Sequence, residues 1–196
     1  MARPRSEDRR NAILSAATRV IAAQGLGAPT AAIAKEAGVS NGSLFVYFDT
    51  KAALLNELYV VLKSEMATTA LAGLPVEAAP RDQVHQMWTQ WVRWATTAPD
   101  KRRALAQLQM SDDITEQSHQ TVSAAFRGIA DLLERSRANG PMQDAPLGFL
   151  LTLTDAMANA AIDTMIREPD QAESHSRVAF EAVWRVIAGS SMPAIA

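Results

Sequence analysis

The chain contains no cysteine among its 196 residues. Disulfide bonds, thiolate metal sites and thiol nucleophiles are therefore excluded. The absence of cysteine fits a reducing compartment, and we expect a cytoplasmic protein.

Targeting and membrane-spanning segments are not predicted either. The arginine-containing N-terminus is not followed by the apolar core of a signal peptide. The most apolar stretch, residues 147–166, is interrupted by Asp155, Asn159 and Asp163. Because charged side chains are costly at the centre of a bilayer, we predict no membrane span.

The motifs of enzymes and metal proteins are also missing. The three histidines, His85, His119 and His175, lack zinc-site spacing. No glycine-rich phosphate loop and no nucleophile elbow occur. Asp112 and Asp113 form a carboxylate pair at a helix start, where acidic residues are favoured in any case. We therefore predict no enzyme activity, no catalytic residue, no metal site and no cofactor.

The chain has no excess of positive charge, since its net charge is −2. The charges are nevertheless unevenly distributed. Residues 1–51 carry seven Lys/Arg and four Asp/Glu, whereas the remainder carries twelve and seventeen. A basic first quarter followed by an acidic remainder points to a polyanionic partner at one end of the chain.

Signals for β-strands are absent, and helical periodicity runs through most of the chain. We predict an all-α protein, with Ser6, Ser40 and Thr50 as N-caps and Gly25 as a C-terminal cap. The predicted helices span about 7–24, 30–37, 41–47, 51–71, 81–97, 101–110, 114–138, 147–167 and 172–189.

Residues 30–51 have the pattern of a helix-turn-helix, with two short helices around a tight turn that contains Gly38. The second helix carries small, polar or aromatic residues where a solvated helix would carry Glu and Lys. Short side chains suit a helix that enters the major groove of DNA. Gly42 costs this helix about 0.5–1 kcal/mol relative to alanine, and a close approach to DNA would explain why it is tolerated.

This segment resembles the DNA-binding domain of the tetracycline-repressor-type (TetR/AcrR) regulators, over roughly the first 60 residues. The matching positions are Gly25, Thr30, Ile33, Ala34, Ala37, Gly38, Val39, Ser40, Gly42, Leu44, Phe45, Tyr47, Phe48, Lys51, Leu54 and Leu55. The resemblance implies a ligand-responsive transcriptional regulator. Such a protein has a DNA-binding domain, residues 1–51 here, and a helical ligand-binding and dimerisation domain, residues 52–196.

The resemblance also implies roles for single residues in DNA binding. Thr30, Tyr47 and Lys51 are expected to contact phosphates, and at helix N-termini Thr30 and Lys51 are well placed for this. The recognition helix, about 41–47, is expected to face bases or sugar-phosphate through Asn41, Gly42, Ser43 and Phe45.

The chain departs from the family pattern at two positions that bear on DNA reading. Phe45 stands where the family usually has tyrosine, so one hydroxyl contact is lost. Ala31 stands where some members have a long base-reading side chain. We therefore expect the N-terminal arm, residues 1–6 with Arg3 and Arg5, to assist from outside the groove.

The remainder of the chain offers candidates for an effector site and a dimer interface. An apolar or aromatic effector would suit walls rich in methionine and aromatic residues, although any one of these residues is more typical of a protein core. The candidates for the wall are Met87, Trp88, Trp91, Met110, Phe126 and Met157. The resemblance implies that the last two helices form a four-helix interface in a homodimer. The candidates for that interface are Leu151, Thr154, Ala158, Ala161, Ile162, Val183 and Ile187.

The sequence thus predicts a repressor that an effector releases from a palindromic operator. A helix-turn-helix dimer expects two half-sites about one or two DNA turns apart. The alternative is a helical protein-binding adaptor that has lost DNA readout. Steep salt dependence of DNA binding would distinguish the regulator from the adaptor.

Overall fold

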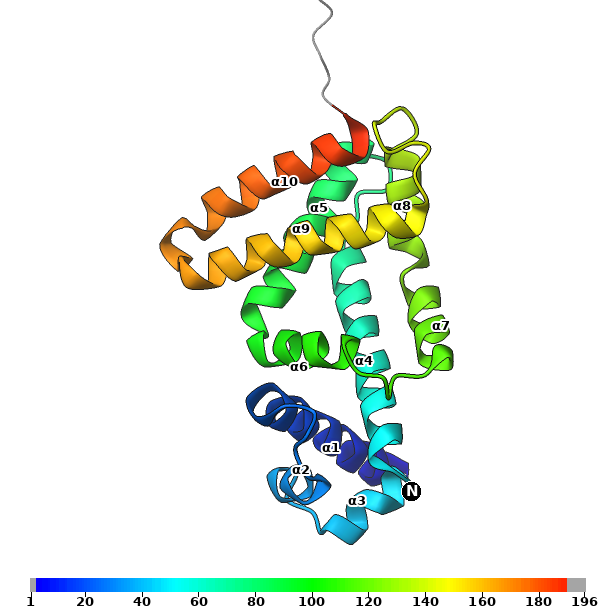
Figure 1. Cartoon of the computed structure of the whole chain (residues 1–196), viewed down its shortest axis with the longest axis vertical. Helices are drawn as coiled ribbons and strands as arrows, with labels where there is room; N and C mark the ends of the chain where they lie inside the picture. The colour runs from blue at the N-terminus through cyan, green and yellow to red at the C-terminus, as the bar shows by residue number, and fades with distance from the viewer. Residues whose placement is uncertain (1–2, 190–196) are drawn as a thin grey trace, which may run out of the picture. The chain divides into compact units, whose positions relative to one another are not determined.

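The computed structural model describes residues 3–189, and their side chains from residue 6 onward, as an all-α protein (Figure 1). The arm residues Arg3 and Arg5 therefore have no described side chains, and the tail after Gly189 lies outside the described residues. The helices are α1 (Arg3–Gln24), α2 (Thr30–Glu36), α3 (Asn41–Tyr47), α4 (Lys51–Leu71), α5 (Pro80–Thr97), α6 (Pro99–Gln109), α7 (Glu116–Ala125), α8 (Arg127–Ser136), α9 (Leu147–Arg167), the 3-10 helix η1 (Pro169–Gln171) and α10 (Ala172–Ala188). The predicted fold class is confirmed.

Three of the four predicted caps are confirmed. The amide of Ser43 donates to the Ser40 hydroxyl at 3.0 Å, and that of Ala53 donates to the Thr50 hydroxyl at 3.0 Å. Gly25 ends α1 with a φ of 84°. This left-handed conformation is easily adopted only by glycine. The prediction for Ser6 was wrong, because α1 begins at Arg3 and includes Ser6. Pro4 is compatible with this earlier start, since proline is tolerated in the first turn of a helix.

One predicted helix, residues 114–138, is two helices in the structure. The break falls at Phe126, which lies between α7 and α8 and has φ and ψ of −86° and −2°. Gly128 follows at once, and a Cβ there would lie 2.9 Å from Leu71 Cδ1. Because this packing depends on a contact remote in sequence, helical periodicity alone does not reveal the break.

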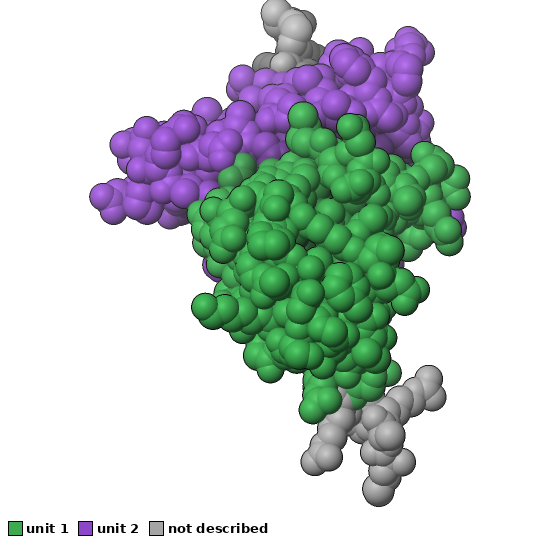
Figure 2. Space-filling view, turned by 60° about the horizontal axis from the view of Figure 1, so that its bottom comes forward, with its two compact units in different colours: residues 1–65, 98–125 green, residues 66–97, 126–196 purple. Residues whose placement is uncertain are grey.

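The chain forms two compact units, coloured separately in Figure 2. The first unit comprises Met1–Glu65 and Ala98–Ala125, so it contains α6 and α7 beside the N-terminal helices. The second comprises Met66–Thr97 and Phe126–Ala196. The functional division predicted from the sequence, at residue 51, differs from this division by compactness and stays a prediction.

Each unit has its own buried apolar side chains. In the first unit they come from α1, α2, α3 and α4, and include Ile13, Ile21, Ile33, Leu44, Leu54 and Leu58. In the second unit α5, α8, α9 and α10 supply the largest ones, such as Trp88, Leu132, Leu150, Ile162 and Ile187. Burial of such side chains contributes about 1.5–3 kcal/mol each, which makes these faces the main source of fold stability.

Candidate nucleic-acid interface

The turn between α2 and α3 has the geometry of a helix-turn-helix. Gly38 adopts a φ of 68°, and the amide of Val39 donates to the carbonyl of Ala34 at 3.0 Å. A residue with a Cβ would be strained at Gly38, so the sharp reversal of the chain depends on glycine. Ser40 then begins α3 by accepting the hydrogen bond of Ser43.

The two sides of α3 have different roles. Leu44 and Phe48 are buried, at 0% and 2% exposure, and pack α3 into the first unit. Asn41, Gly42 and Phe45 are exposed on the other side. Since α3 contains no acidic residue, its exposed side offers no charge that would repel a phosphate backbone.

Gly42 and Ser43 differ in how accessible they are to a ligand of α3. A Cβ added to Gly42 would meet only the Ser40 hydroxyl, at 4.0 Å, so the glycine is not required by packing inside the protein. The Ser43 hydroxyl lies 2.8 Å from that of Ser40, and its side chain is half-buried. Ser43 therefore acts first as part of the cap, whereas Gly42 leaves the backbone open to a ligand.

The three residues expected to contact phosphates are all half-buried. Thr30 is the first residue of α2, Tyr47 is the last of α3, and Lys51 is the first of α4. The Lys51 ammonium donates to the carbonyl of Leu26 at 2.6 Å, which holds α4 to the loop after α1. An ammonium has three donors, so this contact leaves two for a phosphate.

Two basic side chains of α1 are already paired. Arg10 forms an ion pair with Glu57, and its guanidinium lies 5.0 Å from the centre of the Phe48 ring. Arg19 pairs with Glu36 at 2.6 Å. The positive charge predicted for residues 1–51 is therefore only partly available to a polyanion.

A network of polar contacts ties α4 to α7 and to the loop before it within the first unit. The Asn56 amide donates to the carbonyls of Ala52 and Asp113 at 2.9 and 2.7 Å. Its oxygen accepts from the Thr115 amide at 2.8 Å and from the Ser118 hydroxyl at 2.7 Å. Because the amide uses both its donors and its acceptor, Asn56 fixes the loop before α7 on α4.

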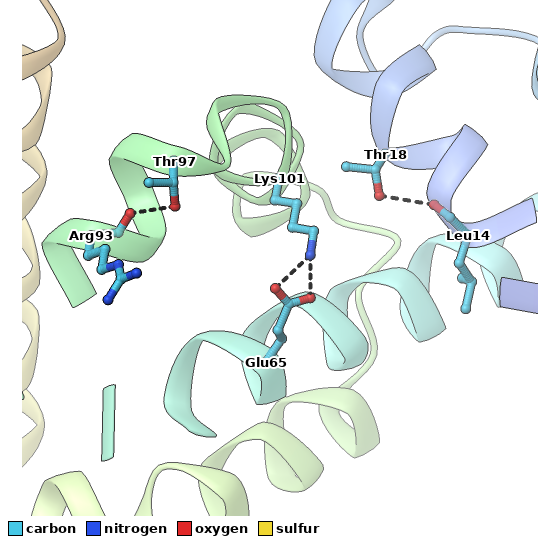
Figure 3. A network of polar contacts seen from close by, with 6 residues as sticks. All are labelled: Leu14, Thr18, Glu65, Arg93, Thr97 and Lys101. Carbon is cyan, nitrogen blue, oxygen red and sulfur yellow. Dashed lines mark hydrogen bonds and ion pairs between the residues drawn. The ribbon is translucent and has the colours of Figure 1, made fainter. Parts of the chain in front are cut away.

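Helix α6 is held to α1 and α4 by side chains of the same unit. The Gln107 amide donates to the carbonyl of Ile21 at 3.0 Å, one turn before Gly25. Lys101 pairs with Glu65 of α4, with both carboxylate oxygens 2.6 to 2.7 Å from its ammonium nitrogen (Figure 3). Helices α1 and α4, which precede and follow the helix-turn-helix in the sequence, are thus both bonded directly to α6.

Tyr59 of α4 gives the first unit a pH dependence. Its hydroxyl lies 3.3 Å from His119 Nδ1, and burial raises its pKa above 10.0 because the phenolate is poorly solvated there. The folded protein therefore holds the phenol proton more tightly than the unfolded chain does. This contribution to stability is complete below pH 10.0 and is lost as the pH rises through the raised pKa.

We expect the free energy of unfolding to fall more steeply above about pH 10 in the wild type than in Tyr59→Phe. Denaturant unfolding at a series of alkaline pH values measures the two slopes. Ultraviolet titration of Tyr47→Phe, which retains Tyr59 as its one tyrosine, reports the raised pKa directly. Equal slopes in the two proteins, with an ordinary phenol titration, would contradict this account.

The residues predicted to line an effector site fall in different parts of the structure. Met87 and Trp88 are buried in α5, and the Trp88 indole donates to the Ser176 hydroxyl of α10 at 3.0 Å. Trp91 lies edge-on to Trp88, with ring centres 6.4 Å apart. The half-buried residues Met157 and Phe126 also belong to the second unit.

Met110 is placed differently from the other predicted lining residues. It follows α6 in the first unit and is 86% exposed. An exposed side chain does not line an enclosed apolar site, so the structure contradicts this part of the prediction. The sequence suggested Met110 only by residue type, which carries no information on burial.

The residues predicted for the dimer interface lie on the face of α9 and α10 that packs within their own chain. Thr154, Ala158, Ile162, Val183 and Ile187 are buried, and Leu151 and Ala161 are half-buried. The opposite face of α9 is exposed and still apolar or small. Its members include Phe149, Thr152, Ala156 and Ala160.

Among the helices of the described residues, α9 is the one that is long and apolar enough to cross a membrane, by length and composition alone. Only 28% of its apolar window is buried. Much of its apolar surface is therefore exposed in the single chain.

The comparisons with known proteins agree with this geometry. Residues 13–58 match the family described as bacterial regulatory proteins, tetR family. A putative tetR family transcription regulator from Shewanella sp. PV-4 is 26% identical, with a TM-score of 0.83 over 92% of this chain and 98% of that one. A TetR family transcription regulator from Marinobacter aquaeolei VT8 is 20% identical, with a TM-score of 0.85 over 95% and 98%.

A third similar structure contains a bound ligand. FadR from Bacillus subtilis, in complex with stearoyl-CoA, is 16% identical, with a TM-score of 0.68 over 92% of this chain and 98% of that one. The helix-turn-helix and the all-α fold thus match those of transcription regulators with an N-terminal helix-turn-helix domain. The segment 13–58 is therefore similar to the DNA-binding domain of the tetR family, and the whole chain is similar in fold to TetR family transcription regulators.

Proposed function

We propose that this protein is a cytoplasmic, ligand-responsive repressor that binds a palindromic operator as a homodimer. The observation that carries the proposal is the exposed side of α3. It is free of acidic residues, and its Gly42 backbone is open because no packing partner covers it. A short helix fixed by a capped turn and a buried leucine is suited to enter the major groove.

In this proposal the contacts on either side of α3 set its register on the DNA. Thr30 and Tyr47 reach phosphates with their hydroxyls, and Lys51 does so with the donors that its bond to Leu26 leaves free. Asn41, Gly42 and Phe45 face the base edges, while Ser43 mainly holds the cap. Phosphate contacts give affinity, and base contacts give specificity.

The dimer in this proposal uses the exposed side of α9 together with α10. Phe149 is 56% exposed and Val178 is 64% exposed, and small residues such as Ala156 and Ala160 permit close helix contact. Dimerisation would bury these apolar side chains, which the single chain leaves in water.

The effector in this proposal binds in the second unit, beside Met87, Trp88, Trp91 and Met157 on α5 and α9. The stearoyl-CoA bound by the B. subtilis FadR makes a long acyl chain a reasonable first probe. Binding would change the fluorescence of Trp88 or Trp91 and lower operator affinity, since an effector acts only through different affinities for two conformers. Fluorescence titration with stearoyl-CoA, and with an aromatic dye if it fails, tests this part.

Selection of genomic DNA fragments by the purified protein tests the function itself. The protein is first unfolded, washed free of small molecules and refolded, so that a bound effector cannot mask DNA binding. We expect one palindromic site to be enriched, at a spacing of about 34–36 Å per DNA turn between half-sites. Absence of any enriched site would overturn the proposal in favour of a protein-binding adaptor.

We expect Lys51→Ala to weaken binding to this site about tenfold. It should also reduce the slope of the logarithm of the binding constant against the logarithm of salt concentration by about one unit per protomer. The loss should be similar on random DNA, because phosphate contacts carry no base information. Gel-shift or anisotropy titrations at several salt concentrations measure both effects. Arg103→Ala, which removes an exposed charge from α6, is the matched control. Unchanged affinity and slope in Lys51→Ala would contradict the phosphate contact.

A further inference from the structure

Val46 is the side chain of α3 that neither the fold nor the predicted contacts explain. It is 80% exposed, beside Phe45, which is 39% exposed. Leu44 and Phe48 already fill the inward positions of this segment. Val46 therefore gains nothing from burial inside the protein.

An exposed valine is also an unfavourable choice for a short helix. Its branched side chain is restricted in a helix, so valine has a lower helix propensity than lysine or glutamate. It lies one turn after Gly42, on the same exposed side of α3 as Asn41 and Phe45. A valine at position 46 is explained if it contacts an apolar group on the DNA that α3 binds.

The major groove of DNA presents one such group, the C5-methyl of thymine. The isopropyl group of Val46 forms no hydrogen bond, so it distinguishes thymine from cytosine by this methyl alone. The exposed side of α3 offers few other means of reading bases. Gly42 has no side chain, and the Ser43 hydroxyl lies 2.8 Å from that of Ser40.

We propose that Val46 reads a thymine methyl in each half-site of the operator and is a specificity-determining residue of the protein. This inference rests on the proposed function, because it requires α3 to lie in the major groove. It assigns to the operator a thymine that the protein recognises by apolar contact rather than by hydrogen bonding.

The experiment removes single methyl groups from the DNA and leaves the wild-type protein unchanged. In the operator obtained by selection, each thymine is replaced in turn by deoxyuridine, symmetrically in both half-sites. Base pairing and hydrogen-bonding groups stay the same. At one position we expect a loss of about fourfold per methyl, or about fifteenfold for both half-sites. Cytosine at that position should bind poorly, and 5-methylcytosine should recover part of the affinity.

The protein variants then assign the effect to Val46. Val46→Ala should bind the thymine operator about as weakly as the wild type binds the uracil operator, and should no longer distinguish the two. Val76→Ala, which shortens another exposed valine outside α3, should keep the wild-type preference for thymine. Thermal unfolding of Val46→Ala should match the wild type, since the side chain is exposed.

The outcomes separate this inference from the proposed function. If an operator binds specifically but no thymine-to-uracil change affects affinity, the assignment of Val46 is wrong and the regulator remains. If Val46→Ala still prefers thymine, another residue reads the methyl and the assignment is also wrong. If no DNA binds specifically, both the proposed function and this inference are overturned.

Discussion

Gly140→Ala is expected to destabilise the protein more than any other single methyl addition in its described loops. Gly140 follows α8, and a Cβ there would lie 2.0 Å from the carbonyl oxygen of Ile187 and 3.0 Å from Ala188 Cα. These are backbone atoms of α10, so no side-chain rotation relieves the clash. Either α10 or the loop must move, at a cost of about 3 kcal/mol or more.

The loop around Gly140 has little freedom to move. Arg137 is buried, and its guanidinium donates to the carbonyl of Met142 at 2.8 Å and also to that of Ala145. The amide of Gly140 donates to the Arg137 carbonyl at 2.8 Å. A shift of Gly140 away from α10 would strain these bonds, which tie the loop together.

Thermal unfolding measures the effect of Gly140→Ala, and we expect a fall in Tm of about 6–15 °C for a chain of this size. Gly148→Ala is the matched control, because a Cβ at Gly148 meets nothing within 4 Å and the residue lies in the first turn of α9. The free energy of unfolding of that control should rise by up to about 1 kcal/mol, because alanine has a higher helix propensity than glycine. Similar melting temperatures for the two variants would show that α10 does not approach Gly140 as closely as described.

Gly42→Glu is expected to abolish specific DNA binding while the protein stays folded. In the free protein the new side chain points into open space, since only the Ser40 hydroxyl lies near, at 4.0 Å from the Cβ position. An acidic residue in the first turn of α3 is favoured by the helix dipole. On DNA the same carboxylate would lie between phosphates, where like charges cost several kcal/mol, so affinity should fall about 100-fold or more.

Binding titrations with the selected operator measure this loss, and circular dichroism confirms the fold. Gln117→Glu adds the same charge at the second position of another helix, α7, outside the proposed DNA and dimer surfaces, and should bind the operator with nearly wild-type affinity. Light scattering of both variants checks that dimerisation is unchanged. Wild-type affinity of Gly42→Glu would show that α3 does not enter the groove.

The helix-turn-helix could be predicted from the sequence because its signals are local. Ser40 and Thr50 cap the helices that follow them, and Gly38 permits the left-handed turn. These preferences act within three or four residues, so they are visible without knowledge of the rest of the fold. The limits of α3 therefore agree with the prediction.

The compact units could not be predicted, because they depend on contacts between residues far apart in sequence. Asn56 binds the loop before α7, and Gln107 binds the end of α1, across separations of more than fifty residues. Nothing in the periodicity of α6 or α7 indicates these partners. The structure therefore groups both helices with the first unit, whereas the predicted functional boundary assigns them to the ligand-binding domain.

The exposed face of α9 and the exposure of Val46 show a different limit. Both sides of α9 are apolar or small, so periodicity predicts a helix but does not say which side faces its own chain. Leu150 and Ala158 prove to be buried, while Phe149 and Ala156 are exposed. The sequence pattern likewise does not indicate that Val46 is exposed.

The most direct test of the central claim is the affinity of the effector-free protein for its selected palindrome, measured against salt concentration and compared with random DNA of equal length. We predict a preference of about a thousandfold or more for the palindrome at physiological salt. We also predict that the binding constant falls steeply with salt, by about 0.9 logarithmic units per phosphate contact for each tenfold rise in salt concentration. Equal, weak binding of both DNAs would contradict the account and would indicate that this helix-turn-helix does not read DNA.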